Sequence, residues 1–224
     1  MGYPRRLILV RHAESVGNTM RDVDERAAYH VPSHAYDLTE RGRKQAEITG
    51  AWLREKYPKV HVRYVSYYKR AKDTMAIMFP GEEVYEDPRL AEAQRGIYNT
   101  MTRKQVEARF PEELERKEKE GLYHYRPLGG ESSPDIELRI ESFLSTLTRD
   151  CRGKTVVIVV HGHWLILFQR VIHHFSIEEA MARYHGGVVP NASVTEYRGT
   201  YDDDGEPYLK LTTPQPIVPW EGKL

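Results

Sequence analysis

The sequence is poor in cysteine and has no long apolar stretch. Its single cysteine, Cys151, excludes an intramolecular disulfide framework and is typical of a reducing compartment. The longest apolar run, Val156 to Val160, is far shorter than the roughly 20 residues that a membrane-spanning helix needs. The apolar stretch Leu7 to Val10 is followed directly by charge and is too short for the core of a signal peptide. We therefore expect a cytoplasmic protein with no membrane segment.

The sequence also lacks an excess of either charge. Lys and Arg total 33 and Asp and Glu total 33, so the formal net charge is zero. A protein that binds nucleic acid or an anionic membrane through bulk charge normally has a basic excess, so neither partner is expected. Any anion-binding site must therefore depend on a few cationic residues that lie close together. The 224 residues suffice for one hydrophobic core but not comfortably for two.

Strand-like and helix-like segments alternate along the chain. Short apolar runs predict strands over residues 7–10, 60–65 and 156–160, with further strands near 193–197 and 208–211. Capped or amphipathic segments predict helices over residues 39–56, 68–79, 102–120 (with a new start at Pro111), 134–150 and 164–174. This alternation predicts the α/β class: a single three-layer α/β/α domain with a mostly parallel sheet. Residues of about 98–130 are expected to form a helical, lid-like insertion, and about 212–224 a peripheral tail.

The two most apolar strands each end in histidine. The run Leu7 to Val10 leads into Arg11 and His12, and the run Val156 to Val160 leads into His161, Gly162 and His163. In an open parallel sheet, ligands bind outside the carboxyl ends of the strands. Cationic groups that converge there suit an anion such as phosphate. Gly162 lets the backbone approach closely, just before a helix whose first N–H groups point outward.

Several short motifs also follow one another in a defined order. They are RHAESVGN (11–18), LTERGRKQA (38–46), SYYKRAKDT (66–74), RLAEAQRG (89–96), GGESSPDIELR (129–139) and HGH (161–163). This series resembles that of the histidine phosphatase superfamily, which includes the cofactor-dependent phosphoglycerate mutases. The resemblance spans roughly residues 7 to 198.

The resemblance implies a role for each matching residue. His12 is the expected nucleophile, because imidazole has an ordinary pKa of about 6.5 and keeps a neutral nitrogen available at neutral pH. Arg11 and Arg70 are expected to clamp the phosphoryl oxygens, since the guanidinium fork matches their geometry. His161, when protonated, would be a further donor to these oxygens, and Asn18 a neutral one.

Glu92 is the expected general acid and base, with Glu82, Glu83, Glu86 and Asp87 as the alternative carboxylates. Ser15 is expected either to contact the phosphate or to shape the turn, and His163 to donate its backbone N–H. Glu131, Ser132, Asp135 and Arg139 are expected to cap and brace the helix that begins there. The pairs His161/His163 and His30/His34 have metal-ligand spacing but no third ligand, so we expect neither a metal nor a cofactor.

The branch of the family is indicated by departures from the mutase pattern. Ala93 stands where mutases carry an arginine, and Arg95 where they carry a tyrosine. These departures favour a phosphatase that acts on a small phosphorylated metabolite or a phosphoprotein. A mutase is the second hypothesis, and a non-catalytic scaffold on the same fold is the third. Arg103, Lys104 and Arg126 in the insertion are either ordinary solvated charges or contacts for an acidic substrate.

Overall fold

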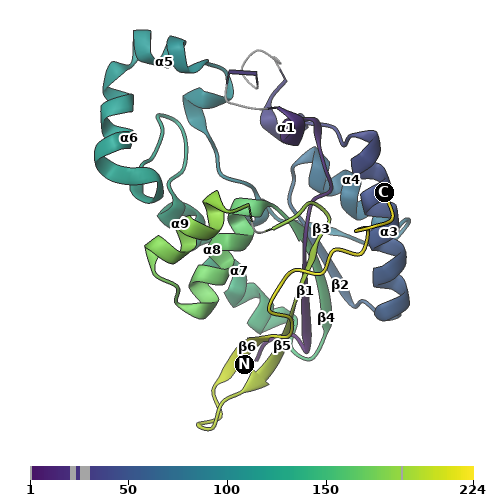
Figure 1. Cartoon of the computed structure of the whole chain (residues 1–224). Coiled ribbons are helices and arrows are strands. Elements are labelled where there is room, and N and C mark those ends of the chain that lie inside the picture. Colours follow the sequence, from purple (N-terminus) through teal and green to yellow (C-terminus); the bar gives the residue numbers. More distant parts are fainter. Residues whose placement is uncertain (1, 21–23, 26–30, 188) are drawn as a thin grey trace.

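A computed structural model of the chain describes residues 2–20, 24–25, 31–187 and 189–224. In this part of the chain, six strands form one sheet in the order β3-β2-β4-β1-β5-β6 (Figure 1). They are β1 (Arg6–Arg11), β2 (Val62–Val65), β3 (Tyr85–Glu86), β4 (Thr155–Val160), β5 (Val194–Tyr201) and β6 (Pro207–Leu211). Strands β1 to β4 are parallel, whereas β5 is antiparallel to β1 and β6 is antiparallel to β5. The predicted mostly parallel sheet is confirmed.

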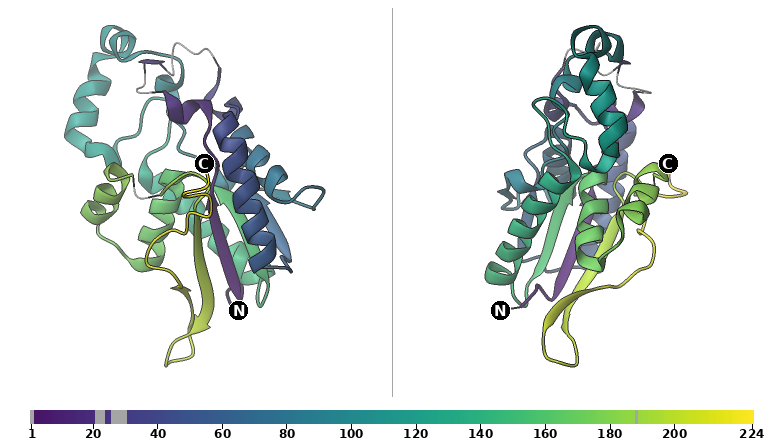
Figure 2. Two further views of the ribbon diagram at one scale, coloured as in Figure 1. Left: turned by 45° about the vertical axis from the view of Figure 1, so that its right-hand side comes forward. Right: turned by 90° about the vertical axis from the view of Figure 1, so that its left-hand side faces the viewer.

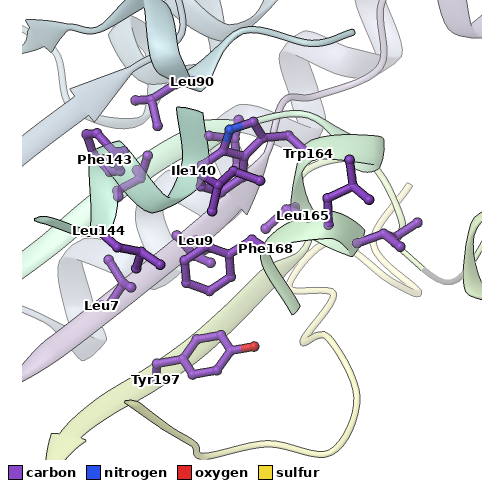
Figure 3. Packing of buried hydrophobic residues seen from close by; sticks show 14 of the residues in the cluster. Leu7, Leu9, Leu90, Ile140, Phe143, Leu144, Trp164, Leu165, Phe168 and Tyr197 are labelled. Atoms are coloured by element: carbon purple, nitrogen blue, oxygen red, sulfur yellow. The ribbon is translucent and has the colours of Figure 1, made fainter. Parts of the chain in front are cut away.

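Helices cover both faces of this sheet, which gives the predicted three layers. One face packs on α3 (Glu40–Lys56) and α4 (Lys69–Met78), and the other on α7 (Ser133–Asp150), α8 (Gly162–His173) and α9 (Ile177–His185). Successive side chains of a strand point to opposite faces. Leu9 of β1 therefore joins Trp164 and Phe168 of α8 (Figure 3), whereas Val10 joins the core beneath α3 and α4. None of the helices among the described residues is long and apolar enough to cross a membrane.

Three observed elements were not predicted from the sequence. The strand β3 has only two residues, and the helix α1 (Val16–Thr19) has only four, so neither produces a periodic pattern. Helix α9 did have a start signal. The Ser176 hydroxyl accepts from the Glu179 N–H at 3.1 Å, and the Glu179 carboxylate accepts from the Ser176 N–H at 2.8 Å. This is a capping box with the S-x-x-E spacing.

The charged region after residue 98 forms two helices, α5 (Arg103–Arg109) and α6 (Pro111–His124). They stand beyond the carboxyl ends of the parallel strands, at the top of Figures 1 and 2. Pro111 begins α6 as predicted, and Gly121, with a positive φ of 71°, interrupts it. Buried Glu113 accepts from the Tyr125 hydroxyl at 2.8 Å and from the Leu128 N–H at 3.1 Å. These bonds hold α6 to the segment that follows this helix.

The C-terminal tail runs back along β5 toward α3 (Figure 1). Ile217 pairs with Val194 through two backbone hydrogen bonds of 2.8 Å. The Trp220 indole N–H donates to the Asn191 carbonyl at 2.8 Å, and the Arg41 guanidinium lies 5.3 Å from the centroid of the Trp220 ring. The tail therefore contacts the loop before β5, which leads to the site described next.

Candidate active site

The sheet register brings the two strand-end histidines together. Arg11 of β1 pairs with Val160 of β4, so the following residues, His12 and His161, lie side by side at the carboxyl edge of the sheet. The His12 N–H donates to the Val160 carbonyl at 2.8 Å, and the two imidazole centroids are 5.1 Å apart. Ser66 follows β2 at the same edge. Residues that are distant in the sequence therefore share one end of the sheet.

The tautomer of His12 follows from its hydrogen bonds. Its Nδ1 lies 2.7 Å from the Ala13 carbonyl, which can only accept, so Nδ1 carries the proton. The lone pair therefore sits on Nε2, where it accepts from the Arg70 Nε–H at 3.1 Å. Burial, followed by the charges of Arg70 and Arg11, lowers the pKa of His12 well below its usual value. His12 is thus neutral at pH 7, and its unprotonated Nε2 faces Arg70.

His161 is also neutral, with the opposite tautomer. Its Nδ1 lies 3.2 Å from Nη2 of Arg70, a group that can only donate, so Nδ1 accepts. The proton is then on Nε2, which donates to the Ser66 hydroxyl at 2.8 Å. Burial and the charge of Arg70 lower the pKa of His161 well below its usual value. No role was predicted for Ser66, although this residue begins the SYYKRAKDT motif.

Arg70 connects these groups. It is buried in the first turn of α4, and besides the two histidines it donates from Nη1 to the Ser33 carbonyl at 2.7 Å. Burial lowers the pKa of Arg70 to about 10, so the guanidinium stays charged at neutral pH. Two of its five N–H groups remain for a ligand in this arrangement.

Arg11 supplies a second cation with spare donors. Its Nη1 donates to the Val189 carbonyl, whereas its buried Nε has no hydrogen-bond partner among the described residues. A Cβ on Gly162 would lie only 3.4 Å from that Nε, so glycine leaves room for the guanidinium. Burial lowers the pKa of Arg11 and the charge of Glu92 raises it. A buried, unsatisfied guanidinium N–H is what an anion site requires.

The amide of Asn18 is oriented by its neighbours. Its Oδ1 accepts from the Ser15 N–H at 3.0 Å, from the Ser15 hydroxyl at 3.1 Å and from Nδ2 of Asn191 at 3.3 Å. The Asn18 NH₂ group is therefore left for a ligand. Asn191 also donates to the His12 carbonyl at 3.0 Å, and its own carbonyl accepts from Trp220. Neither Asn191 nor Trp220 was predicted from the sequence, because both act through contacts that only the fold creates.

Glu92 lies in the loop after β3. Its Oε1 accepts from the Ala93 N–H at 3.1 Å, and its Oε2 accepts from the His163 N–H at 3.4 Å. That N–H, predicted to face a phosphate, faces Glu92 in this structure, and the His163 ring lies 3.3 Å from the Ser133 hydroxyl. The alternative carboxylates have other partners: Glu82 pairs with Arg63, Glu86 with Lys72, Asp87 with Arg89, and Glu83 bonds Tyr85.

The loop that carries Glu92 is braced from α7. Ser132 and Asp135 form a capping box at the start of this helix, as the motif indicated. Arg139 pairs with Glu131 at 3.0 Å and donates to the Arg89 carbonyl at 2.8 Å. These residues hold the backbone on both sides of the loop that carries Glu92, and none of them needs to contact a substrate.

The structure gathers the predicted residues around one pocket of about 970 Å³. All of them except His161 line it: Arg11, His12, Ser15, Asn18, Arg70, Glu92, Gly162 and His163. His161 is fully buried and contacts the pocket through Arg70. Of the cations expected in the insertion, Arg103 lines the pocket, Arg126 pairs with Asp135, and Lys104 is exposed outside it.

The predicted pair His161/His163 is not part of a metal site among the described residues. The described residues contain no cluster of three His, Cys, Asp or Glu side chains with suitable geometry. His34 lies near the rings of Tyr67 and Tyr68, whereas His30 lies outside the described residues.

Comparison with known proteins agrees with this arrangement. The family profile of the histidine phosphatase superfamily (branch 1) matches residues 7–212, so the chain belongs to this superfamily, as its motifs predicted. A phosphoserine phosphatase of Hydrogenobacter thermophilus is 32% identical over 158 residues, which cover 70% of each chain. The solved structure of a mycobacterial glucosyl-3-phosphoglycerate phosphatase in complex with VO₃ has a TM-score of 0.67 and 25% identity, and covers 94% of this chain and 99% of that one.

The relatives of the chain include proteins named as phosphatases and proteins named as mutases. A phosphoglycerate mutase-like protein of Arabidopsis thaliana is 34% identical over 164 residues, which cover 66% of this chain and 54% of that protein. The chain therefore spans about half the length of the plant relatives that it matches. 2,3-Bisphosphoglycerate-dependent phosphoglycerate mutases are also relatives. Superfamily membership thus supports a phosphatase- or mutase-type enzyme.

Proposed function

We propose that the protein is a phosphatase that hydrolyses a small phosphomonoester through a phosphohistidine on His12. The observation that carries this proposal is the neutral His12 ring, whose Nε2 lone pair faces Arg70 beside the spare donors of Arg11. A dianionic phosphoryl group is a better acceptor than imidazole, so it draws the Arg70 Nε–H away from Nε2. Substrate binding thereby frees the nucleophile.

The reaction then proceeds in two transfers. In the first, Nε2 of His12 bonds to phosphorus, the ester P–O bond breaks, and the carboxylic acid of Glu92 gives its proton to the departing alkoxide. In the second, the Glu92 carboxylate takes a proton from water, and that water oxygen bonds to phosphorus as the P–N bond breaks. The products are the alcohol and inorganic phosphate, and His12 and Glu92 return to their starting forms.

Preorganised charge would supply most of the rate enhancement. Arg11, Arg70 and the Asn18 NH₂ surround the place where charge spreads over the equatorial oxygens. His161 holds Arg70 through its Nδ1, and its Nε2–H donates to the Ser66 hydroxyl. His161 thus acts as a neutral partner of Arg70 in this reaction.

Hydrolysis is favoured over mutase chemistry because of the loop after Glu92. Ala93 and Arg95 replace the arginine and tyrosine of the mutase pattern, and both line the pocket. A mutase must keep water from its phosphoenzyme, which a phosphatase need not do. We propose that residues 98–130 form the lid of a single domain, since α5 and α6 contribute Arg103 and Lys117 to the pocket wall.

Release of inorganic phosphate from p-nitrophenyl phosphate tests the proposal. The parent protein should turn over, and His12→Ala should lose at least about a thousandfold in kcat, a size typical of a lost nucleophile. His185→Ala, which changes an exposed histidine outside the pocket, is the matched control and should be unaffected. Conversion of 3-phosphoglycerate to 2-phosphoglycerate faster than phosphate release would identify a mutase. No turnover of any phosphomonoester would favour the scaffold.

A further inference from the structure

One cation of the pocket has no role in the reaction described above. Arg95 is half-buried and lines the pocket next to the loop that carries Glu92. No acidic side chain in the described part of the chain pairs with its guanidinium. Glu131 follows Gly130, which forms a backbone bridge with Arg95, but its carboxylate is bound to Arg139 and to the Gln94 N–H. A partly buried arginine without a partner is costly, so such residues are usually kept for a ligand.

The backbone at Arg95 is held rigidly by its neighbours, and this fixes the position of Arg95 at the pocket. Arg95 forms an antiparallel bridge with Gly130, the Glu131 N–H donates to the Gln94 carbonyl at 2.9 Å, and the Ile97 N–H donates to the Leu128 carbonyl at 3.0 Å. Gly96 has a positive φ of 54°, and a Cβ there would lie 2.1 Å from the Leu128 carbonyl oxygen. The turn can therefore form only with glycine, and it fixes Arg95 at the pocket wall.

Three guanidinium groups, those of Arg11, Arg70 and Arg95, line the pocket around the Glu92 loop. The proposed reaction uses Arg11 and Arg70 for the transferred phosphoryl group, which leaves Arg95 for another part of the substrate. Burial is the main cause that lowers the pKa of Arg70 and of His163, and the charge of Arg95 adds to both shifts, so Arg95 acts on the reaction end of the pocket. The lid cations that line the pocket, Lys117 and Arg103, are accompanied there by the carboxylates Glu115 and Glu118.

We propose that Arg95 binds a second anionic group of the substrate, a carboxylate or a further phosphate, on the leaving-group side of the scissile bond. This inference rests on the proposed phosphatase function and specifies its substrate class. The pocket has ample room for such a molecule, since its volume of about 970 Å³ is many times that of a phosphate ion. Arg95 is thus a specificity-determining residue and takes no part in the chemical step.

The test compares substrates that differ only in the second charge. 3-Phosphoglycerate and glycerol 3-phosphate share a carbon skeleton and differ at a carboxylate, and fructose 1,6-bisphosphate and fructose 6-phosphate differ at a phosphate. The parent protein should have the higher kcat/KM for the anionic member of at least one pair, and which pair it is distinguishes carboxylate from phosphate. Arg95→Gln should reduce that preference roughly 10- to 100-fold, the size of a lost charged hydrogen bond, and leave the neutral member unchanged. Arg95→Lys should restore part of it.

Lys104→Gln is the matched control, because it removes a lid charge outside the pocket and should leave every ratio unchanged. Equal ratios in the parent and in Arg95→Gln, or a preference for the neutral members, would overturn the inference while hydrolysis itself stands. If the protein hydrolyses no phosphomonoester, p-nitrophenyl phosphate included, the proposed function fails. Calorimetric binding of 3-phosphoglycerate and glycerol 3-phosphate to the parent and to Arg95→Gln then decides the second-anion site separately.

Discussion

Asn191 is the residue through which the C-terminal tail contacts the His12 backbone, and its removal has a calculable effect. Asn191→Ala deletes the 3.0 Å hydrogen bond to the His12 carbonyl and the 3.3 Å bond to Asn18 Oδ1. Each contributes on the order of 0.5–1.5 kcal/mol, so the total is about 1–3 kcal/mol. Part of this is lost from folding stability. The rest appears in catalysis, because the Asn18 amide loses one of the donors that orient it and a small misplacement near the reacting atoms is costly.

We expect Asn191→Ala to lower kcat/KM for p-nitrophenyl phosphate by about tenfold and to weaken inhibition by inorganic phosphate, with a moderate fall in the melting temperature. Trp220→Phe retains the aromatic ring but removes the 2.8 Å bond to the Asn191 carbonyl, and should give a smaller loss in the same direction. Unchanged kcat/KM and phosphate inhibition in folded Asn191→Ala would refute the reasoning, since the tail would then have no influence on the site.

Three further predictions follow from single side chains or glycines. Because the folded-state pKa of His12 and of His161 is depressed, their contribution to stability is present above about pH 6.5 and is lost as pH falls below it. The melting temperature of His161→Gln should therefore approach that of the parent between pH 7 and pH 5, and a constant gap would contradict this. Glu92→Gln should slow alkyl phosphates far more than aryl phosphates, and equal losses would remove Glu92 from the acid role. Gly42→Ala should destabilise the fold by about 2 kcal/mol or more in urea unfolding, because the new Cβ would lie 2.0 Å from the Glu14 carbonyl oxygen; a neutral effect would mean that the α3 start can shift.

The sequence predicted the structure best where a short local pattern, such as an apolar run or a helix cap, determines an element. The apolar runs before His12 and His161 predicted two buried strands, and the parallel register of β1 and β4 then placed both rings at one sheet edge. Helix bounds at Pro111 and near Asp150 were predictable, because proline and capping residues act locally. The family motifs added Arg70 and Glu92, which no periodicity would have brought to the same pocket.

The unpredicted features depend on contacts between distant segments. The opposite tautomers of His12 and His161 are set by the Ala13 carbonyl and the Arg70 guanidinium, and the sequence carries no signal for either bond. Asn191 lies 179 positions from His12, so only the fold reveals that its amide supports the nucleophile loop. These are hydrogen bonds across the sheet edge, and no propensity or spacing rule anticipates them.

The position of the phosphoryl group on the enzyme tests the central claim most directly. The parent protein mixed with substrate and quenched in alkali should carry one acid-labile phosphoryl group on His12, as located by mass spectrometry and absent in His12→Ala. Phosphorus NMR of the labelled peptide should place it on Nε2, because Nδ1 is protonated and bound to the Ala13 carbonyl. A phosphoryl group on Nδ1 or on another residue, or turnover with no covalent intermediate, would contradict the account.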